Sequence, residues 1–468
     1  MIERRYDLVI IGAGPAGYIA ALHAAHRGLH VACIEKRSTL GGTCLNVGCI
    51  PSKALLQVTE QYAWMQHSAK EQGVEYSSLS YNFPQIMRRK QQIVAGLVSG
   101  ISSLFKRRAI AHIQGQARLV SAHTIEVEQG GSSRLIEAEH ILLATGSESV
   151  SLPFLPCDGK IVLSSTEALE LEAVPERLAI IGAGVIGVEF ASIYSRLGSQ
   201  VTVIEMLDKI CPAIDVAIAN ILLQILQKQK IRFRLSSKVE RALIEDRAVV
   251  LHIVPNGGEP FDLTADLLLV AVGRRPCSAH LGLEQIGIQI TAEGFVRVDG
   301  AFRTSHPHIF AIGDLIEGPM LAHRASTEAI ACIEILTGHS CPPVEYQCIP
   351  NVIYTHPEVA VVGVTEEEAE QAGLAVTIGT APFRGNPRAR CSGDVDGMVK
   401  IVGDRVSGRL LGVHIIGSHA SEIIGQAVMA LHAKISLQQL AFTCYAHPTL
   451  SEVIKEAAMA ALGTPLHA

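Results

Sequence analysis

One motif occurs twice in the chain and constrains its fold more than any other feature. In each copy a short apolar stretch runs into a glycine-rich turn, a helical pattern follows, and a second apolar stretch ends at a glutamate. The first copy covers residues 6–35 and the second covers residues 178–205. Each copy predicts a strand, a tight turn, a helix and a second strand, and hence an α/β fold. The glycines are Gly12, Gly14 and Gly17 in the first copy, and Gly182, Gly184 and Gly187 in the second.

The three glycines of such a turn have separate physical roles. The first allows the tight turn, the second lets the backbone approach a pyrophosphate, and the third lets helix and strand pack closely. The helix N-terminus then offers amide groups and a partial positive charge to the phosphates. Glu35 and Glu205 follow the glycines at about the spacing at which such motifs carry an acid that binds the ribose hydroxyls. One such motif is weak evidence, but two copies in the same context predict two dinucleotide-binding sites.

Glu205 also predicts which nicotinamide the second site takes. Its carboxylate would repel a 2′-phosphate, and no Arg or Lys follows it until Lys209. Because an NADP site needs a cationic partner at this point, we expect NAD rather than NADP.

Length and composition agree with this interpretation. The chain has 468 residues, enough for about three domains. Apolar residues make up 48% and aromatic residues only 4%, so aliphatic side chains should form the cores. The net charge of −6 comes without a basic stripe, because the basic run at 106–108 is isolated and should be a solvated surface. We therefore expect no nucleic-acid partner.

Cysteine use and the N-terminus indicate the compartment. Eleven cysteines are far fewer than a secreted disulfide scaffold of this length would carry, so most should be small buried thiols in a reducing compartment. Arg4 and Arg5 precede an apolar stretch, residues 8–22, that resembles a secretory signal. That stretch is too short to span a bilayer and is interrupted by glycines and Pro15. We expect a cytoplasmic protein without a membrane partner.

One cysteine pair, Cys44 and Cys49, lies soon after the first motif. An ideal helix would separate their Cα atoms by about 8–9 Å, whereas a disulfide needs less than about 7 Å. The two can therefore bond only where the helix start is distorted, which Gly48 is suited to permit. Such a bond should be easily reduced, and a helix N-terminus favours the reactive thiolate. On spacing alone, two buried thiols without a redox role remain an equal alternative.

A candidate acid–base pair opens the last helical pattern. Oxidation of a dithiol needs a base to take the thiol proton, and histidine titrates near neutrality. Glu452 lies close enough along the chain to orient His447. The segment from Thr449 to Glu452 also fits a capping box, in which the acid binds the helix start. Both roles of Glu452 can hold together, and for a single histidine among nineteen no role would be the default.

Residues 41–53, which contain both cysteines, resemble the active-site segment of the dihydrolipoamide dehydrogenase family of glutathione-reductase-like flavoenzymes. The resemblance covers nearly the full chain and extends to residues 144–146, 272–276, 312–323 and 446–452. It implies two Rossmann-like dinucleotide-binding domains, for FAD and NAD, and a C-terminal α+β dimerisation domain. The segments expected are 1–148 for FAD, 149–275 for NAD, 276–345 completing the FAD domain, and 346–468 for dimerisation.

The resemblance also implies a role for individual residues. Cys49 would face the flavin ring, and Cys44 would exchange with the substrate. Lys53 would sit by the flavin and pair with Glu189. Asp314, which alone would pass for a strand-end turn residue, would bind the ribityl chain of FAD, and the Ala322 backbone would contact the end of the flavin. Further cofactor contacts are expected from Gly42, Thr43, Ala117, Thr145, Gly146, Val239, Ala271 and Gly273.

The implied activity is oxidation of dihydrolipoyl groups on a lipoyl carrier domain, with NAD⁺ reduced to NADH. The Cys44–Cys49 disulfide would take the electrons, with His447 as base in the active site of the partner subunit of an obligate homodimer. Glu452 would orient that histidine. The partner would be the acyltransferase core of a 2-oxo acid dehydrogenase complex, or a glycine-cleavage system. No metal site is expected.

Three other functions compete with this one. Reduction of another disulfide, such as that of glutathione, from NADPH is opposed by the lack of a cationic pair after Glu205 and by residues 51–56. Mercuric reduction would need a thiol pair in the tail, residues 463–468, which has none. A non-catalytic scaffold or adhesin predicts loss of the site residues, yet all are present.

Three segments of the resemblance stand apart from these assignments. Tyr445 departs from the family, which commonly has a histidine two residues before the catalytic one, and we expect tuning rather than loss of activity. Residues 354–358 match a family segment that we interpret as structural. No role is assigned to residues 383–389.

Overall fold

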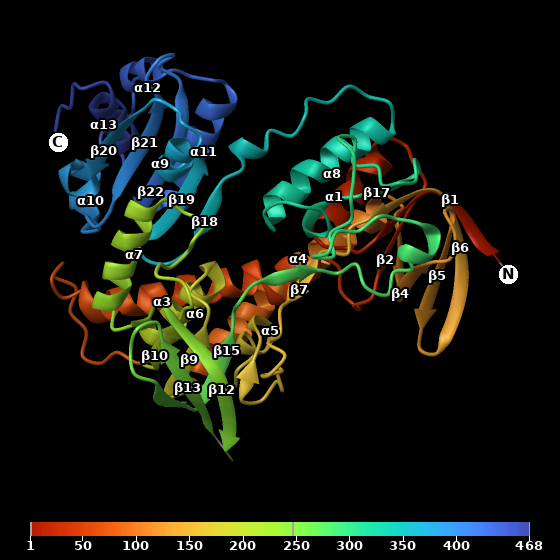
Figure 1. Cartoon of the computed structure of the whole chain (residues 1–468), viewed down its shortest axis with the longest axis horizontal. Coiled ribbons are helices and arrows are strands. Elements are labelled where there is room, and N and C mark those ends of the chain that lie inside the picture. The colour runs from red at the N-terminus through yellow and green to blue at the C-terminus, as the bar shows by residue number, and fades with distance from the viewer. Residues whose placement is uncertain (1, 246–247, 468) are drawn as a thin grey trace. The chain divides into compact units, whose positions relative to one another are not determined.

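The computed structural model describes residues 2–245 and 248–467. The chain forms two compact units, each assembled from three separate segments (Figure 1). The first unit contains residues 1–55, 84–150 and 273–344, and the second contains residues 56–83, 151–272 and 345–468. Helix α3, Cys49–His67, begins in the first unit and continues into the second.

The first unit is built on a seven-stranded sheet whose strand order is β3-β2-β1-β6-β5-β4, with β17 also paired to β6. The strands β3, β2, β1, β6 and β17 run parallel, and β5 and β4 continue the sheet antiparallel from β6. The strands are β1 Ile2–Ile11, β2 Val31–Glu35, β3 Ala111–Gln114, β4 Gln116–Leu119, β5 Thr124–Gln129, β6 Ser132–Leu143 and β17 Ile309–Ala311.

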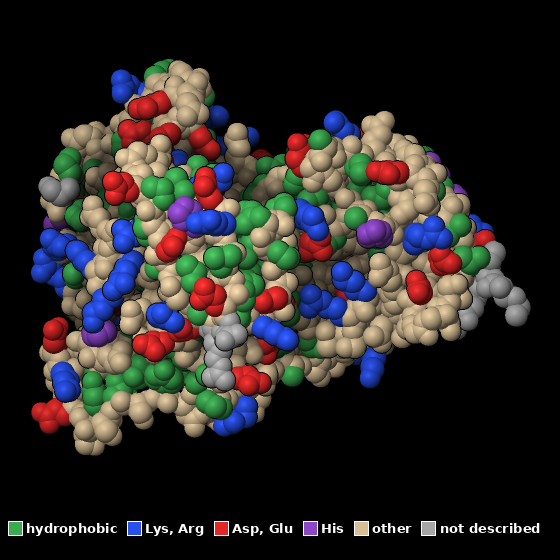
Figure 2. Space-filling view, turned by 60° about the horizontal axis from the view of Figure 1, so that its bottom comes forward, with side chains coloured by type: hydrophobic (Ala, Val, Ile, Leu, Met, Phe, Trp, Pro, Cys, Tyr) green, Lys and Arg blue, Asp and Glu red, His purple; other side chains and the backbone are tan. Residues whose placement is uncertain are grey.

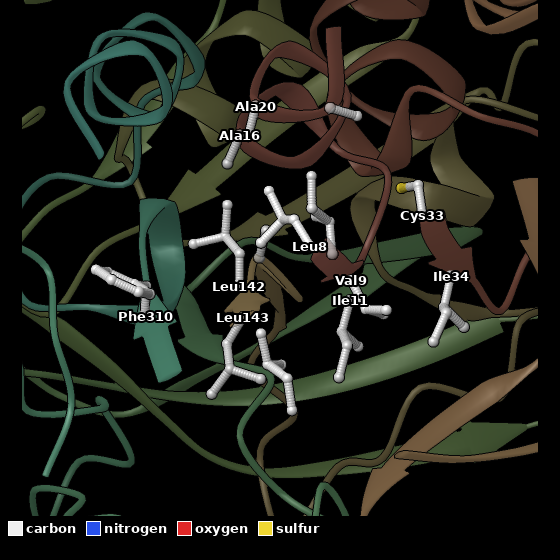
Figure 3. Close-up of a cluster of buried hydrophobic side chains, with 14 of the residues drawn as sticks. Leu8, Val9, Ile11, Ala16, Ala20, Cys33, Ile34, Leu142, Leu143 and Phe310 are labelled. Atoms are coloured by element: carbon white, nitrogen blue, oxygen red, sulfur yellow. The ribbon is translucent and has the colours of Figure 1, made fainter. Parts of the chain in front are cut away.

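Helices α1, Pro15–His26, and α8, Ala322–Leu336, lie side by side in this unit (Figure 1). Leu8 of β1 and Leu142 of β6 point toward Ala16 and Ala20 of α1, and all four are buried (Figure 3). Burying a leucine side chain contributes roughly 1.5–3 kcal/mol. This aliphatic core confirms the expectation from composition. The remaining elements are α2 Gly42–Val47, α4 Phe83–Arg107, β7 Ser147–Ser149, β16 Arg274–Pro276, and the 3₁₀ turns η1 Glu284–Ile286 and η2 Gly313–Leu315.

The second motif opens a five-stranded, all-parallel sheet in the second unit, with order β11-β10-β9-β15-β8. An antiparallel sheet, β12-β13-β14, is inserted in the chain between β11 and β15. The elements are β8 Val162–Leu163, α5 Ser165–Ala168, β9 Arg177–Ile181, α6 Val185–Arg196, β10 Gln200–Ile204, α7 Val216–Lys228, β11 Arg232–Arg234, β12 Ser237–Glu245, β13 Ala248–Pro255, β14 Phe261–Ala265 and β15 Leu267–Val270.

The rest of the second unit has a five-stranded antiparallel sheet, β18-β19-β22-β21-β20, that packs against helices α11 and α13. Helix α11 follows β22 in the chain, and a separate helix α12 follows α11. The elements are η3 Tyr346–Cys348, β18 Asn351–Ile353, β19 Glu358–Gly363, α9 Glu366–Gln371, β20 Val376–Pro382, η4 Phe383–Gly385, α10 Pro387–Ser392, β21 Met398–Asp404, β22 Leu410–Gly417, α11 Ala420–His432, α12 Leu437–Phe442 and α13 Glu452–Ala461.

The predicted α/β class is confirmed, with a strand–turn–helix–strand motif in each of two sheets, one mixed and one all-parallel. Among the residues described, no helix combines the length and apolarity needed to cross a bilayer. The basic run at 106–108 is exposed, as expected. Figure 2 shows one face on which basic and acidic side chains are interspersed rather than separated by sign.

The glycine turns have the same construction in both units. Gly12 and Gly182 have φ values of +101° and +102°, a region that side chains disfavour. A Cβ on Gly17 would overlap the carbonyl oxygen of Gly12, and a Cβ on Gly187 would overlap that of Gly182. The third glycine of each motif therefore lets the helix pack directly on the turn, as the sequence predicted.

We expect Gly187→Ala to destabilise the protein by at least about 2 kcal/mol, because the new methyl group meets backbone that cannot move aside. Gly184→Ala is the matched control: its φ is −72°, and no atom of the described residues lies within 4 Å of the added Cβ. Thermal unfolding of the two variants checks this. Equal melting temperatures would contradict the packing role of Gly187.

Candidate active site

The acid that ends each motif binds its own glycine turn. Glu35 is buried and accepts hydrogen bonds from the Ala13 and Arg37 amides, both at 2.9 Å. Glu205 accepts from the Ala183 amide at 2.7 Å and from the Leu207 amide at 2.9 Å. The sequence pattern predicted a ribose-binding role alone for these acids. The structure adds a second role, since each carboxylate fixes the turn while a carboxylate oxygen can still accept further bonds.

Both turns leave room for a phosphate group beside the helix N-terminus. A Cβ placed on Gly184 would have no atom of the described residues within 4 Å, and one placed on Gly14 would meet only the Cα of Gly42, at 4.0 Å. In the described chain, neither α1 nor α6 has a side-chain cap on its first amides. Free space, uncapped amides and a helix dipole are the features that bind a pyrophosphate. The residues present therefore fit a dinucleotide at each turn.

The cysteine pair lies at a break between two helices. Cys44 is in α2, Gly48 ends that helix, and Cys49 begins α3. A Cβ on Gly48 would lie 3.2 Å from the Cα of Cys44 and 2.9 Å from the Thr43 carbonyl oxygen. Only glycine allows the chain to pass this close, so the expected distortion at Gly48 is present.

The two sulfur atoms interact as thiols in this structure. The side-chain hydrogen bond with Cys49, then burial, then the charge of Cys49 raise the pKa of the Cys44 thiol, while the charge of Lys53 lowers it. Cys49 is exposed and Cys44 is half-buried. Two hydrogen-bonded cysteine side chains at a helix break are placed for exchange between dithiol and disulfide.

The other residues expected around FAD lie in the first unit. Thr43 is in α2, Ala117 is buried in β4, and Ala322 is the first residue of α8. Thr145 donates through Oγ1 to the Cys277 carbonyl at 2.8 Å, and Asp314 lies in η2. Gly42 lies in contact with Gly14 of the first glycine turn. Gly146 has a φ of +71°.

The residues expected around NAD lie in the second unit or at its edge. Val239 is buried in β12, and Ala271 follows β15, with its carbonyl against Gly182. Gly273, the first residue of the segment 273–344 that completes the first unit, has a φ of +121°. Lys53 lies in the first unit and Glu189 in the second, where a carboxylate oxygen of Glu189 accepts from the Tyr354 amide at 3.0 Å. Their pairing remains a prediction.

The structure brings His447 and Glu452 together. His447 Nδ1 lies 3.0 Å from Glu452 Oε1, and the Thr449 amide donates to Glu452 Oε2 at 2.8 Å. Burial raises the pKa of Glu452, but the bonds from Thr449 and His447 outweigh it and hold the pKa below its ordinary value. An ionised Glu452 favours the histidine tautomer with Nδ1–H toward the acid, which leaves Nε2 of this largely exposed side chain as a proton acceptor.

The capping box expected from Thr449 is only half present. Glu452 binds the Thr449 amide, but the Thr449 hydroxyl donates to the Ala446 carbonyl instead. Helix α13 begins at Glu452 with Ser451 as its N-cap residue, two positions after the expected cap. The chain therefore uses the acid to hold the loop that carries His447.

His356, in the segment interpreted as structural, sits between two carboxylates. Its Nδ1 lies 2.9 Å from Glu60 Oε1 and its Nε2 lies 3.4 Å from Asp394 Oδ1. Burial lowers the pKa of His356, but the bonds and charges of Asp394 and Glu60 outweigh it and raise the pKa to about 9. Residues 56–83 and 345–468 of the second unit are thus joined at this histidine.

A second group of ligand-type side chains, Glu345, Cys348 and His432, was not expected from the sequence. Glu345 Oε2 lies 3.5 Å from the Cys348 sulfur and 3.4 Å from His432 Nδ1. The three could hold a metal ion, and two of them are exposed. Their sequence separation gives no spacing signal, and their contacts are already those of a hydrogen bond and an ion pair.

Comparison with known proteins places this site in a family. Residues 6–329 match the pyridine nucleotide-disulphide oxidoreductase family, and residues 349–458 match the dimerisation domain of the same family. The chain belongs to the pyridine nucleotide-disulphide oxidoreductases, and its C-terminal sheet and helices form their dimerisation domain.

Similar proteins within that family are dihydrolipoamide dehydrogenases. The one from Chaetomium thermophilum is 46% identical over 99% of this chain and 93% of its own length. The mitochondrial dihydrolipoyl dehydrogenase of the dog, Canis lupus familiaris, is 43% identical over 97% and 90%. A solved structure, the Cu(II) complex of an HOCl-induced flavoprotein disulfide reductase from Escherichia coli, is 30% identical, with a TM-score of 0.88 over 97% of this chain and 99% of that one.

The position of His356 predicts a pH-dependent stability. A pKa raised from an ordinary value of about 6.5 to about 9 means that this ion pair stabilises the fold fully below pH 6.5. The contribution is lost as the pH rises through about 9. The pKa values of Glu60 and Asp394 are lowered, so their own contributions change only at acidic pH.

Melting temperatures of the wild type and of His356→Gln should therefore differ most near pH 6.5 and converge toward pH 9.5. His432→Gln, which removes a largely exposed histidine with one carboxylate neighbour, is the control and should show no such convergence. A gap between wild type and His356→Gln that stays constant over this range would contradict the ion pair.

Proposed function

We propose that this chain oxidises dihydrolipoyl groups and reduces NAD⁺, that is, it acts as a dihydrolipoyl dehydrogenase. The observation that carries the proposal is the interacting Cys44–Cys49 pair at the helix break, next to a glycine turn that fits a dinucleotide. Relatives of this name at 43–46% identity over nearly the whole chain support it.

In the proposed first half-reaction a substrate thiolate attacks the sulfur of Cys44 in the Cys44–Cys49 disulfide. The disulfide breaks and Cys49 leaves as a thiolate. His447 accepts the substrate proton on Nε2, and Glu452 stabilises the resulting imidazolium. The second substrate thiol then displaces Cys44, which gives a cyclic lipoyl disulfide and the dithiol enzyme. Two electrons have passed from substrate to protein, as this ping-pong scheme requires.

When bound, FAD would supply the redox chemistry that links the dithiol to NAD⁺. The residues proposed to hold FAD are those of the first turn with Glu35, Lys53, Asp314 and Ala322. The second turn and Glu205 would hold NAD. We propose that residues 1–148 and 276–345 form the FAD domain, residues 149–275 the NAD domain, and residues 346–468 the dimerisation domain.

The enzyme is proposed to act as a homodimer in which His447 serves the cysteine pair of the partner subunit. The dimerisation domain and the exposure of the His447 side chain, 67%, support this arrangement. The carrier would be a lipoyl domain bound to an acyltransferase core of a 2-oxo acid dehydrogenase complex, or a glycine-cleavage system. The proposed location is cytoplasmic, on the basis of the few cysteines in the chain, eleven in 468 residues. Relatives such as the dog enzyme are named mitochondrial.

A second candidate is reduction of a different disulfide. It is favoured by the likeness to the Escherichia coli flavoprotein disulfide reductase. Steady-state turnover separates the two candidates: we expect rapid turnover with dihydrolipoamide and NAD⁺, and little with glutathione disulfide and NADPH. The reverse result would overturn the substrate assignment and leave the family unchanged.

Cys44→Ser should abolish turnover with dihydrolipoamide, because no mixed disulfide with the substrate can form. Cys391→Ser, which changes an exposed cysteine outside the pair, is the matched control and should retain the wild-type rate. Retention of the rate by Cys44→Ser would show that the exchanging thiol has been misassigned.

His447→Gln should lower kcat/KM for dihydrolipoamide by about 10²–10⁴-fold, the usual contribution of a positioned base. Glu452→Gln should lower it less, since the amide can still bind the ring but cannot stabilise the imidazolium. Measurement of kcat/KM for the two variants, with FAD content determined in both, checks that the loss is larger in His447→Gln. A larger loss in Glu452→Gln would point to a structural role of its carboxylate in the loop.

A further inference from the structure

Three side chains from separate secondary-structure elements of the first unit meet at η2. Ser147 begins β7, Arg274 begins β16, and Asp314 lies in η2. Strands β7 and β16 pair antiparallel, with Arg274 opposite Ser149. The Ser147 hydroxyl donates to Asp314 Oδ2 at 2.5 Å, and Arg274 Nε donates to Ser147 Oγ at 2.8 Å. A second guanidinium nitrogen donates to the Ser147 carbonyl at 2.6 Å.

The chemistry of the three groups fixes the direction of every proton. A guanidinium has donors and no acceptor, so the Ser147 oxygen must accept from Arg274. The one hydroxyl proton of Ser147 must then point at Asp314. Ser147 is buried, with 7% of its surface exposed, so water cannot readily replace either neighbour. The two hydrogen bonds therefore have a single direction: Arg274 donates to Ser147, and Ser147 donates to Asp314.

We propose that Arg274 is a positioning residue which, through Ser147, holds the Asp314 carboxylate as a fixed acceptor for the ribityl hydroxyls of FAD. The inference rests on the proposed binding of FAD in this unit. Ser147 uses Oδ2 of the carboxylate, so Oδ1 can accept from a ligand hydroxyl. The Arg274 guanidinium also donates to the Ser147 carbonyl, so it fixes both the position of the Ser147 backbone and the rotamer of the hydroxyl.

The neighbouring arginine shows how specific this arrangement is. Arg275 pairs with Glu148 at 2.8 Å, and their side chains are 65% and 51% exposed. Such a surface pair contributes little to stability. Arg274 and Arg275 are adjacent and carry the same charge, but Arg274 directs its hydrogen bonds to a buried residue whereas Arg275 binds an exposed one. Arg275→Gln is therefore a control matched in charge, size and position.

The experiment measures FAD binding to the apoprotein, without any turnover. Wild type, Ser147→Ala, Arg274→Gln, Arg274→Lys and Arg275→Gln are stripped of flavin and titrated with FAD, with flavin fluorescence as the signal. We expect Ser147→Ala and Arg274→Gln each to raise the dissociation constant about tenfold, the loss of one charge-assisted hydrogen bond. Arg274→Lys should recover part of the loss, and Arg275→Gln should bind like the wild type.

The double variant Ser147→Ala with Arg274→Gln provides the second test. If Arg274 acts through Ser147, the double variant should bind FAD no more weakly than the worse single variant. Three outcomes would each overturn the proposal. The double variant could lose as much FAD affinity as the two single variants together. Arg274→Gln could bind FAD as tightly as the wild type, or Arg275→Gln could lose as much affinity as Arg274→Gln. Failure of the wild-type apoprotein to bind FAD would instead overturn the proposed function.

Discussion

The helix break at Gly48 is the constraint on which the proposed chemistry depends. A continuous helix would hold Cys44 and Cys49 too far apart to bond, by the geometry of its rise and radius. Gly48 lets the chain fold back onto the Thr43 carbonyl and the Cys44 backbone, which brings the two sulfur atoms into hydrogen-bonding contact. A Cβ at position 48 would meet the Thr43 carbonyl oxygen at 2.9 Å, so a larger residue would force the backbone around Cys44 to shift. The proximity of the two sulfur atoms thus depends on the backbone at a single position.

Each motif acid has a structural role that limits how its cofactor preference can change. Glu205 holds the Ala183 and Leu207 amides, so it shapes the second turn before any ligand arrives. Replacing it with a residue suited to a 2′-phosphate would remove the repulsion but also free two amides. Glu35 binds the first turn in the same way. Selectivity and turn geometry are therefore coupled through the same carboxylate.

The sequence predicted those parts of the molecule whose signals are local. Strands, turns and helices of the two motifs follow from periodicity and glycine spacing, and the pairing of His447 with Glu452 follows from a short loop. The contact of Ser147 with Asp314 joins residues 167 positions apart, and no periodicity marks it. The ion pairs of Lys400 with Asp215 and Glu366 were missed for the same reason.

Buried charge in the first unit explains how the segment that carries Asp314 is held. Glu328 of α8 accepts from the Gly313 amide at 2.7 Å and from Arg324 at 2.8 Å, and both side chains are almost fully buried. Arg324 in turn donates to the Pro319 and Glu317 carbonyls. Burying an ion pair gains little net stability, since desolvation offsets the attraction.

The Arg324–Glu328 ion pair holds neighbouring backbone in position rather than adding much stability. The pair satisfies backbone groups on both sides of η2, which an apolar replacement could not do. Asp314 is thereby held from two directions, by the backbone through Glu328 and by its side chain through Ser147. A carboxylate fixed in this way can bind a ligand hydroxyl without first losing conformational freedom, which is the advantage of a preorganised site.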